Sequence, residues 1–254
     1  MNFNNHINAD VIKNSQQLKL TNKLSLCNTD IDPDKHIFSQ YENLNNKYYL
    51  EHDFNSMIVH EAPSVNFSVM HINARSLSKN LKQITNYLDD LQHKFSIICI
   101  TETWTNNDNE LLLTIPGYKR YLKNRETGRG GGVALFVLDD LSCSLRNDLD
   151  IYANINFEFI FIELHHPSIG HKIVGAVYRP PDSNLDLFMN GFDCVMSKLT
   201  LSKAECIITG DFNIDLLKNE SHIGTGQFIS SLLSLSNTNH YQTNQVWQRY
   251  LNTH

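Results

Sequence analysis

Apolar residues recur in short runs from residue 67 onward, and their spacing predicts alternating strands and helices. Runs of about four to eight apolar or β-branched residues between polar or turn residues indicate buried strands. Apolar residues three or four positions apart indicate a helix with one buried face. The strands predicted in this way are 67–73, 95–101, 131–137, 157–164, 171–178 and 205–213. The helices predicted in this way are 80–92, 185–199 and 226–236.

The order of these elements predicts a layered α/β fold with mixed sheets. The segment HPSIG separates the strands predicted at 157–164 and 171–178, and its length and composition indicate a hairpin loop. A hairpin joins antiparallel strands, which argues against a purely parallel sheet. Because several strands look buried on both sides, we expect sheets that are covered by helices.

The two ends of the chain lack this pattern. Residues 1–66 are rich in Asn, Lys, Asp and His, and we predict a disordered or loosely structured leader there. Residues 237–254 are predicted to be a divergent tail, which leaves 67–236 as the domain. The N-terminus has no signal-peptide core, and no apolar run approaches the roughly 20 residues that span a bilayer. We therefore expect no membrane partner and an intracellular protein, nuclear if it is functional.

Composition narrows the classes of function only slightly. The 254 residues are 41% hydrophobic, which fits one domain with an appendage. The net charge of −6 argues against binding nucleic acid by bulk charge alone, although a metal site needs acidic residues. The odd number of cysteines and the absence of a CxxC pair predict free thiols, buried where they lie in apolar runs, and a reducing compartment. These cysteines are Cys27, Cys99, Cys143, Cys194 and Cys206.

Polar side chains follow directly after four of the predicted strands. They are Asn73, Glu102, Tyr178, Arg179, Asp211 and Asn213. Ligand sites often form from the loops at strand ends, so these groups could converge. Carboxylate and amide oxygens suit Mg²⁺, and a carboxylate beside the ion can activate water for attack on a phosphate. In an extended segment, Asp211 and Asn213 would face the same side. Each residue alone also fits a solvated strand end or a turn, and only their joint arrangement favours a site.

Six short motifs occur in order along the predicted domain. They are NARSL (73–77), TETW (101–104), IPGY (115–118), NRETGRGGGVALFV (124–137), YRPP (178–181) and GDFN (210–213). This set resembles the endonuclease/exonuclease/phosphatase superfamily, and most of all the endonuclease domain of non-LTR (LINE-type) retrotransposons. The resemblance implies a four-layer α/β sandwich of two mostly antiparallel sheets flanked by helices.

The same resemblance implies roles for five residues and a set of partners. Asn73 and Glu102 would lie at the metal site, with Glu102 as the principal ligand. Tyr178 would contact the scissile phosphate, Asp211 would orient or activate water, and Asn213 would stabilise the transition state. The cofactor would be Mg²⁺ or Mn²⁺, and the reaction would be the nicking of DNA by hydrolysis. An intact parent polyprotein would also carry a reverse transcriptase domain.

Basic residues between 119 and 129 are candidates for DNA contact. They are Lys119, Arg120, Lys123, Arg125 and Arg129. They fit either a phosphate-contacting rim or an ordinary charged loop. Arg179 is a further candidate, as is Arg75, which stands where many superfamily members carry an acidic residue and which fits the retrotransposon branch. The GRGGG run lacks the Gly-Lys-Ser/Thr of a phosphate-binding loop.

Four other residues near these motifs are interpreted as structural. His165 and His166 lie in the predicted hairpin loop and are expected at the surface. Trp104 is expected to pack on a strand end. His71 is also expected to pack, on the argument that its strand position points it away from Asn73.

The last motifs of the superfamily are not found after Asn213. These are an Asp-containing segment and a terminal Ser-Asp-His, whose Asp-His pair supports phosphate binding and water activation. We therefore expect a domain that is incomplete at its C-terminus, with poor stability and reduced or absent activity. Two alternatives stay open: an inactive remnant or binding module, and a superfamily phosphatase. The NARSL, TETW and YRPP set argues against the phosphatase.

Overall fold

The computed structural model describes residues 51–60, 67–105, 112–125, 130–151, 156–215, 218 and 221–236. The helices are α2 Glu51–His60, α3 Leu77–Asp90, α4 Leu185–Thr200 and α5 Ile223–Ser236, with a 3-10 turn η2 at Asn147–Leu149. The first four strands are β1 Val69–Asn73, β2 Ile97–Thr101, β3 Tyr118–Lys123 and β4 Val133–Leu138. The other four are β5 Cys143–Leu145, β6 Glu158–His166, β7 Gly170–Tyr178 and β8 Glu205–Asp211.

The strands form two four-stranded mixed sheets. The strand order is β1-β2-β4-β3 in the first sheet and β5-β6-β7-β8 in the second. Each sheet has one parallel pair, β1 with β2 and β7 with β8, and its other pairs are antiparallel. The β6–β7 pair is the predicted hairpin, so the expected fold class of two mostly antiparallel sheets with helices is confirmed.

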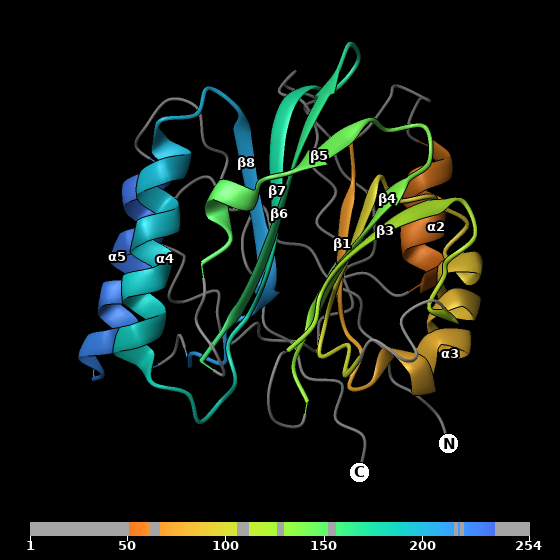
Figure 1. Cartoon of the computed structure of the whole chain (residues 1–254). Helices are drawn as coiled ribbons and strands as arrows, with labels where there is room; N and C mark the ends of the chain where they lie inside the picture. The colour runs from red at the N-terminus through yellow and green to blue at the C-terminus, as the bar shows by residue number, and fades with distance from the viewer. Residues whose placement is uncertain are drawn as a thin grey trace.

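The layers follow from the alternation of side chains along each strand. Ile97 and Cys99 on β2 face the second sheet. Ile98 and Ile100, which alternate with them along the strand, pack in the cluster that contains α3 residues. The sheets thus bury one shared core between them. The outer face of the first sheet is covered by α2 and α3, and that of the second by α4 and α5 (Figure 1). The result is a four-layer sandwich.

The second outer layer illustrates how the sequence specifies a helix on a sheet. The side chain of Asn184 accepts a hydrogen bond from the Leu187 backbone N–H at 3.0 Å, which caps the start of α4. Its apolar residues at helical spacing then meet the aromatic face of β6, where Phe188 lies 5.9 Å from Phe159 between ring centroids. This cluster fixes α4 against the second sheet, beside the strands that carry Tyr178 and Asp211.

The expected unstructured leader is wrong for residues 51–60, which form α2. Phe54 is fully buried and stacks on Phe95 with 6.0 Å between ring centroids. The Asn55 side-chain amide also donates to the Asp90 carbonyl at 2.8 Å. A ten-residue helix gains most of its stability from such packing, which a reading of local periodicity misses. Residues 1–50, 61–66 and 237–254 lie outside the described part, so the boundaries at 67 and 236 stay predictions.

The structure adds two strands that the sequence pattern did not reveal, the three-residue β5 and the longer β3. Residues Tyr118–Lys123 form β3 at the edge of the first sheet, paired with β4. Charged side chains are common on edge strands because they discourage pairing with another chain. The interpretation of this segment as a charged loop is therefore wrong. None of the helices in the described ranges is long and apolar enough to cross a membrane.

Candidate active site

Three of the predicted site residues meet where the two parallel strand pairs end. Asn73 is the last residue of β1, Glu102 directly follows β2, and Asp211 is the last residue of β8. The Asn73 side-chain amide donates one hydrogen bond to Glu102 Oε1 and one to Asp211 Oδ2, each at 2.8 Å. The amide therefore joins carboxylates from two different sheets, and Asn73 and Asp211 are 138 positions apart in the sequence.

The backbone around this junction adopts unusual conformations. Five of the six described non-glycine residues with positive φ lie within three residues after the last residue of β1, β2 or β8. They are Arg75, Ser76, Glu102, Trp104 and Asn213. Such conformations cost free energy and cluster at functional sites, where they direct side chains that regular strands could not. Here the Ser76 N–H donates to the Glu102 carbonyl at 2.9 Å, which holds two of these loops together.

Tyr178 lies directly beside Asp211 because β7 and β8 are in register there. The close approach depends on Gly210, where an added Cβ would lie 1.8 Å from the Val177 carbonyl oxygen. Burial raises the pKa of the Tyr178 phenol, and the negative charges of Glu102 and Asp211 raise it further. The phenol is therefore a hydrogen-bond donor at neutral pH, inside a region of negative potential.

A model of the endonuclease/exonuclease/phosphatase family matches residues 65–251 of this sequence. The chain belongs to this family. No curated protein matches the sequence significantly. Among solved structures, an AP endonuclease from Archaeoglobus fulgidus is similar at 16% identity and a TM-score of 0.45, covering 66% of this chain and 70% of that chain.

Two further solved structures show a comparable similarity. The catalytic domain of Xenopus laevis APE2 has 14% identity and a TM-score of 0.47, covering 64% of this chain and 66% of that chain. The 3′ phosphatase NExo from Neisseria, bound to product DNA hairpin, has 20% identity and a TM-score of 0.44, covering 66% and 70%. Membership of the endonuclease/exonuclease/phosphatase family rests on the family model.

In this family member, Asn213 and Arg179 hold the loop that follows Asp211. Arg179 is only 5% exposed and donates from Nε to the Phe212 carbonyl at 2.7 Å and from Nη2 to the Asn213 carbonyl. The Asn213 side-chain amide donates back to the Arg179 carbonyl at 2.8 Å, and its backbone N–H donates to Asp211 Oδ1 at 3.2 Å. The placement of Arg179 argues against its predicted contact with DNA, because its donors are directed into the loop.

Asn213 also departs from the predicted geometry. The strand ends at Asp211, and Asn213 has a φ of 48° in the left-handed region. The assumption of an extended Asp-Phe-Asn segment is therefore wrong. The turn instead lets the Asn213 backbone N–H donate to Asp211 Oδ1.

Arg125 lies next to Tyr178, and its side chain is only 10% exposed. Its Nε donates to Glu158 Oε1 at 2.5 Å, and its guanidinium carbon lies 5.8 Å from the centre of the Tyr178 ring. Burial raises the pKa of Glu158, and Arg125 opposes that shift. Arg125 Nη2 and Glu158 Oε2 are buried without a partner among the described residues. The ion pair therefore packs beside the Tyr178 ring. The buried position of Arg125 does not fit the predicted surface rim.

Three of the other predicted DNA contacts have partners among the described residues. Lys119 Nζ donates to the Asp139 carbonyl at 2.6 Å, and Lys123 pairs with Asp150 at 2.9 Å. The Arg120 guanidinium donates to the Leu113 carbonyl at 2.6 Å. Arg129 lies outside the described residues, and Arg75 is exposed immediately after Asn73. The rim along 119–129 is therefore not supported by the described geometry, whereas Arg75 remains well placed.

His71 on β1 was not predicted to lie beside the site residues. Residues two apart in a strand face the same side, so His71 shares a face with Asn73, and the opposite expectation was wrong. Its Nε2 lies 3.0 Å from Thr101 Oγ1. Burial lowers the pKa of His71 to about 4, although the charge of Asp211 acts in the other direction. The spacing relative to Asn73 was the signal that could have placed it.

Two other expectations for single residues had different outcomes. Trp104 is 37% exposed, and its packing on the strand end stays a prediction. His165 and His166 lie on β6 and not in the hairpin loop as predicted, whereas the 68% exposure of the His165 side chain confirms its expected place at the surface.

Proposed function

We propose that this chain is a divalent-metal-dependent phosphodiester hydrolase that nicks DNA, of the type encoded by non-LTR retrotransposons. The observation that carries the proposal is the contact of one Asn73 amide with both Glu102 and Asp211. The family membership supports a hydrolase of phosphate esters. The retrotransposon branch, with its reverse transcriptase partner, rests on the NARSL, TETW and YRPP motifs and on Arg75.

The donor atoms at this junction fit a hard divalent ion. They are carboxylate and amide oxygens, which Mg²⁺ and Mn²⁺ prefer. Burial is the main cause of the raised pKa of Tyr178, and the charges of Glu102 and Asp211 add to it, so a cation here would neutralise a negative potential. Glu102 and the Asn73 amide oxygen would hold the ion. When bound, the ion polarises a phosphoryl oxygen and stabilises the charge that develops on the phosphate.

The remaining steps are carried by side chains of this protein. Asp211 orients the attacking water and accepts its proton, because it lies at the junction and is itself fixed by the Asn213 backbone N–H. The Tyr178 phenol donates a hydrogen bond to a non-bridging phosphate oxygen. The side-chain amide of Asn213 donates to the Arg179 carbonyl, so its proposed contact with the transition state requires a rotation of that amide.

Nicking of supercoiled plasmid DNA by the full chain, with Mg²⁺ or Mn²⁺ added, tests this proposal. We expect conversion to the relaxed form that requires the metal and that is lost in Glu102→Gln. Asp140→Asn, a carboxylate-to-amide change at an exposed residue outside the junction, should leave the rate unchanged. The same assay measures the nicking rate, which we expect to be low because the last motifs of the superfamily are not found after Asn213.

Three results would contradict the proposal. Nicking that survives in Glu102→Gln would show that the junction does not carry the reaction. An unsubstituted chain that does not nick DNA but releases phosphate from phosphoinositides would favour the phosphatase alternative. A chain that does neither would favour the inactive remnant.

A further inference from the structure

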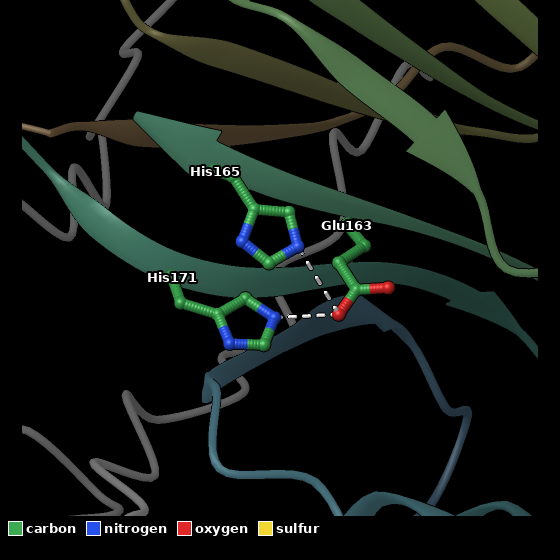
Figure 2. Close-up of side chains that lie close together, drawn as sticks. All are labelled: Glu163, His165 and His171. Carbon is green, nitrogen blue, oxygen red and sulfur yellow. Dashed lines mark hydrogen bonds and ion pairs between the residues drawn. The ribbon is translucent and has the colours of Figure 1, made fainter. Parts of the chain in front are cut away.

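A second cluster of chemically active side chains lies at the opposite end of β7 from Tyr178. Glu163 and His165 on β6 and His171 on β7 point toward one another on one face of the hairpin (Figure 2). His165 and His171 are directly paired across the hairpin, and Glu163 is two residues before His165 on the same face. One potential ligand atom from each of the three residues lies within 4.8 Å of the other two.

Both imidazoles direct the same nitrogen to the same carboxylate oxygen. His171 Nε2 lies 2.5 Å from Glu163 Oε1, and His165 Nε2 lies 3.7 Å from that oxygen. The two rings stack with centroids 4.0 Å apart and an interplanar angle of 22°. A hydrogen bond between Glu163 and His171 would explain only the shorter of these two contacts. It does not explain why the second imidazole also presents Nε2 to this point.

We propose that Glu163, His165 and His171 form a binding site for a borderline transition-metal ion, with Zn²⁺ as the expected occupant. Two imidazole nitrogens and one carboxylate oxygen are a ligand set that zinc accepts, with a fourth position left for water. Mg²⁺ prefers oxygen ligands throughout, so this site and the proposed active site would select different ions. The exposure of the His165 side chain gives an ion access from solvent.

The carboxylate ligand is oriented by groups behind it. Arg146 Nη1 lies 3.5 Å from Glu163 Oε2, on the oxygen that does not face the imidazoles. Arg146 is itself fixed by Asp148, which accepts from Nε and Nη2 at 2.8 Å each. Such a contact on the far oxygen holds a metal ligand in one orientation and tunes its affinity. Glu163 therefore presents Oε1 alone to the site.

The site is separate from the chemistry proposed at the other end of the strand. His171 and Tyr178 are seven residues apart on β7, which corresponds to about 23 Å at roughly 3.3 Å per residue. An ion bound here would cross-link β6 and β7 near the hairpin turn. Because such an ion binds the folded hairpin and not the unfolded chain, it would stabilise the second sheet.

Titration of Zn²⁺ into the metal-free, reduced full chain, followed by calorimetry, tests the site. We expect one equivalent to bind here, with affinity weakened about tenfold or more in His165→Ala and in His171→Ala. His166→Ala is the matched control, because His166 adjoins His165 but faces the other side of the strand, and it should change the affinity by less than about twofold. The melting temperature should rise with Zn²⁺ in the unsubstituted chain and not in the two variants.

A spectroscopic measurement identifies the ligands directly. Cu²⁺ bound to the full chain should show electron paramagnetic resonance splitting from two imidazole nitrogens, reduced to one in His171→Ala. Zn²⁺ affinity that is the same in His165→Ala, in His171→Ala and in the unsubstituted chain would overturn the proposal. Zn²⁺ binding that Glu102→Gln abolishes would also overturn it, because the ion would then belong to the other end of β7. A loss of nicking with Zn²⁺ binding intact would affect only the proposed function.

Discussion

The two ends of β7 carry two different kinds of candidate metal site. At the Tyr178 end, the groups are oxygens that come from both sheets and from loops with positive φ. At the His171 end, they are two imidazoles and one carboxylate from a single hairpin in regular register. The first depends on contacts between residues 138 positions apart, and the second on residues at most eight apart. The comparison shows that a site can be built either by the packing of sheets or by one local pairing.

The largest expected effect concerns the oxygen-rich end. Asp211→Asn keeps the shape of the side chain but removes its ability to accept a proton, so nicking should slow about 10³-fold, or about 4 kcal/mol in the barrier. Initial rates on plasmid DNA measure this change. The comparison would fail if Glu163→Gln at the imidazole end slowed the reaction as much.

The second effect is on stability at low pH. The pKa of His71 is lowered to about 4 in the folded protein, below its ordinary value of 6.5, so the unfolded chain binds the proton first as the pH falls. The stability that neutral His71 contributes is therefore fully present above pH 6.5. It is lost as the pH falls from 6.5 to 4, which lowers the free energy of unfolding by up to about 3 kcal/mol.

Urea unfolding at a series of pH values measures this decline. His71→Gln should flatten that part of the profile, whereas His166→Gln at the hairpin should leave it in place. An unchanged slope in His71→Gln would show that the imidazole is not held neutral by the fold.

The smallest effect separates two arginines beside the oxygen-rich end. Arg75 is exposed, so Arg75→Ala should weaken DNA binding by about 1 kcal/mol or less and reduce the salt dependence by about one phosphate contact. Arg179 is buried in the loop after Asp211, so Arg179→Ala should lower the free energy of unfolding by about 2 kcal/mol. Fluorescence anisotropy at several salt concentrations and urea unfolding distinguish the two. A change in salt dependence for Arg179→Ala would contradict the buried role.

The sequence predicted a strand at 95–101 from a short apolar run, and the structure has β2 at Ile97–Thr101 with every residue buried. It did not predict β3, whose lysines and arginine hide an edge strand, or α2, which is held by Phe54 packing on distant residues. Motifs could suggest which residue types form the site. The contact between Asn73 and Asp211 depends on how the two sheets pack, and no local pattern encodes that distance.

The approach of β7 to β8 at Gly210 has a consequence for how this sequence can evolve. Around Gly170 there is open space, so a replacement there meets only the strain of a positive φ. At position 210 even a methyl group would collide with the Val177 carbonyl and force apart the strands that carry Tyr178 and Asp211. In a saturation library selected for nicking, position 210 should accept no alternative residue, and lineages that keep the activity should keep this glycine while the surface around it drifts.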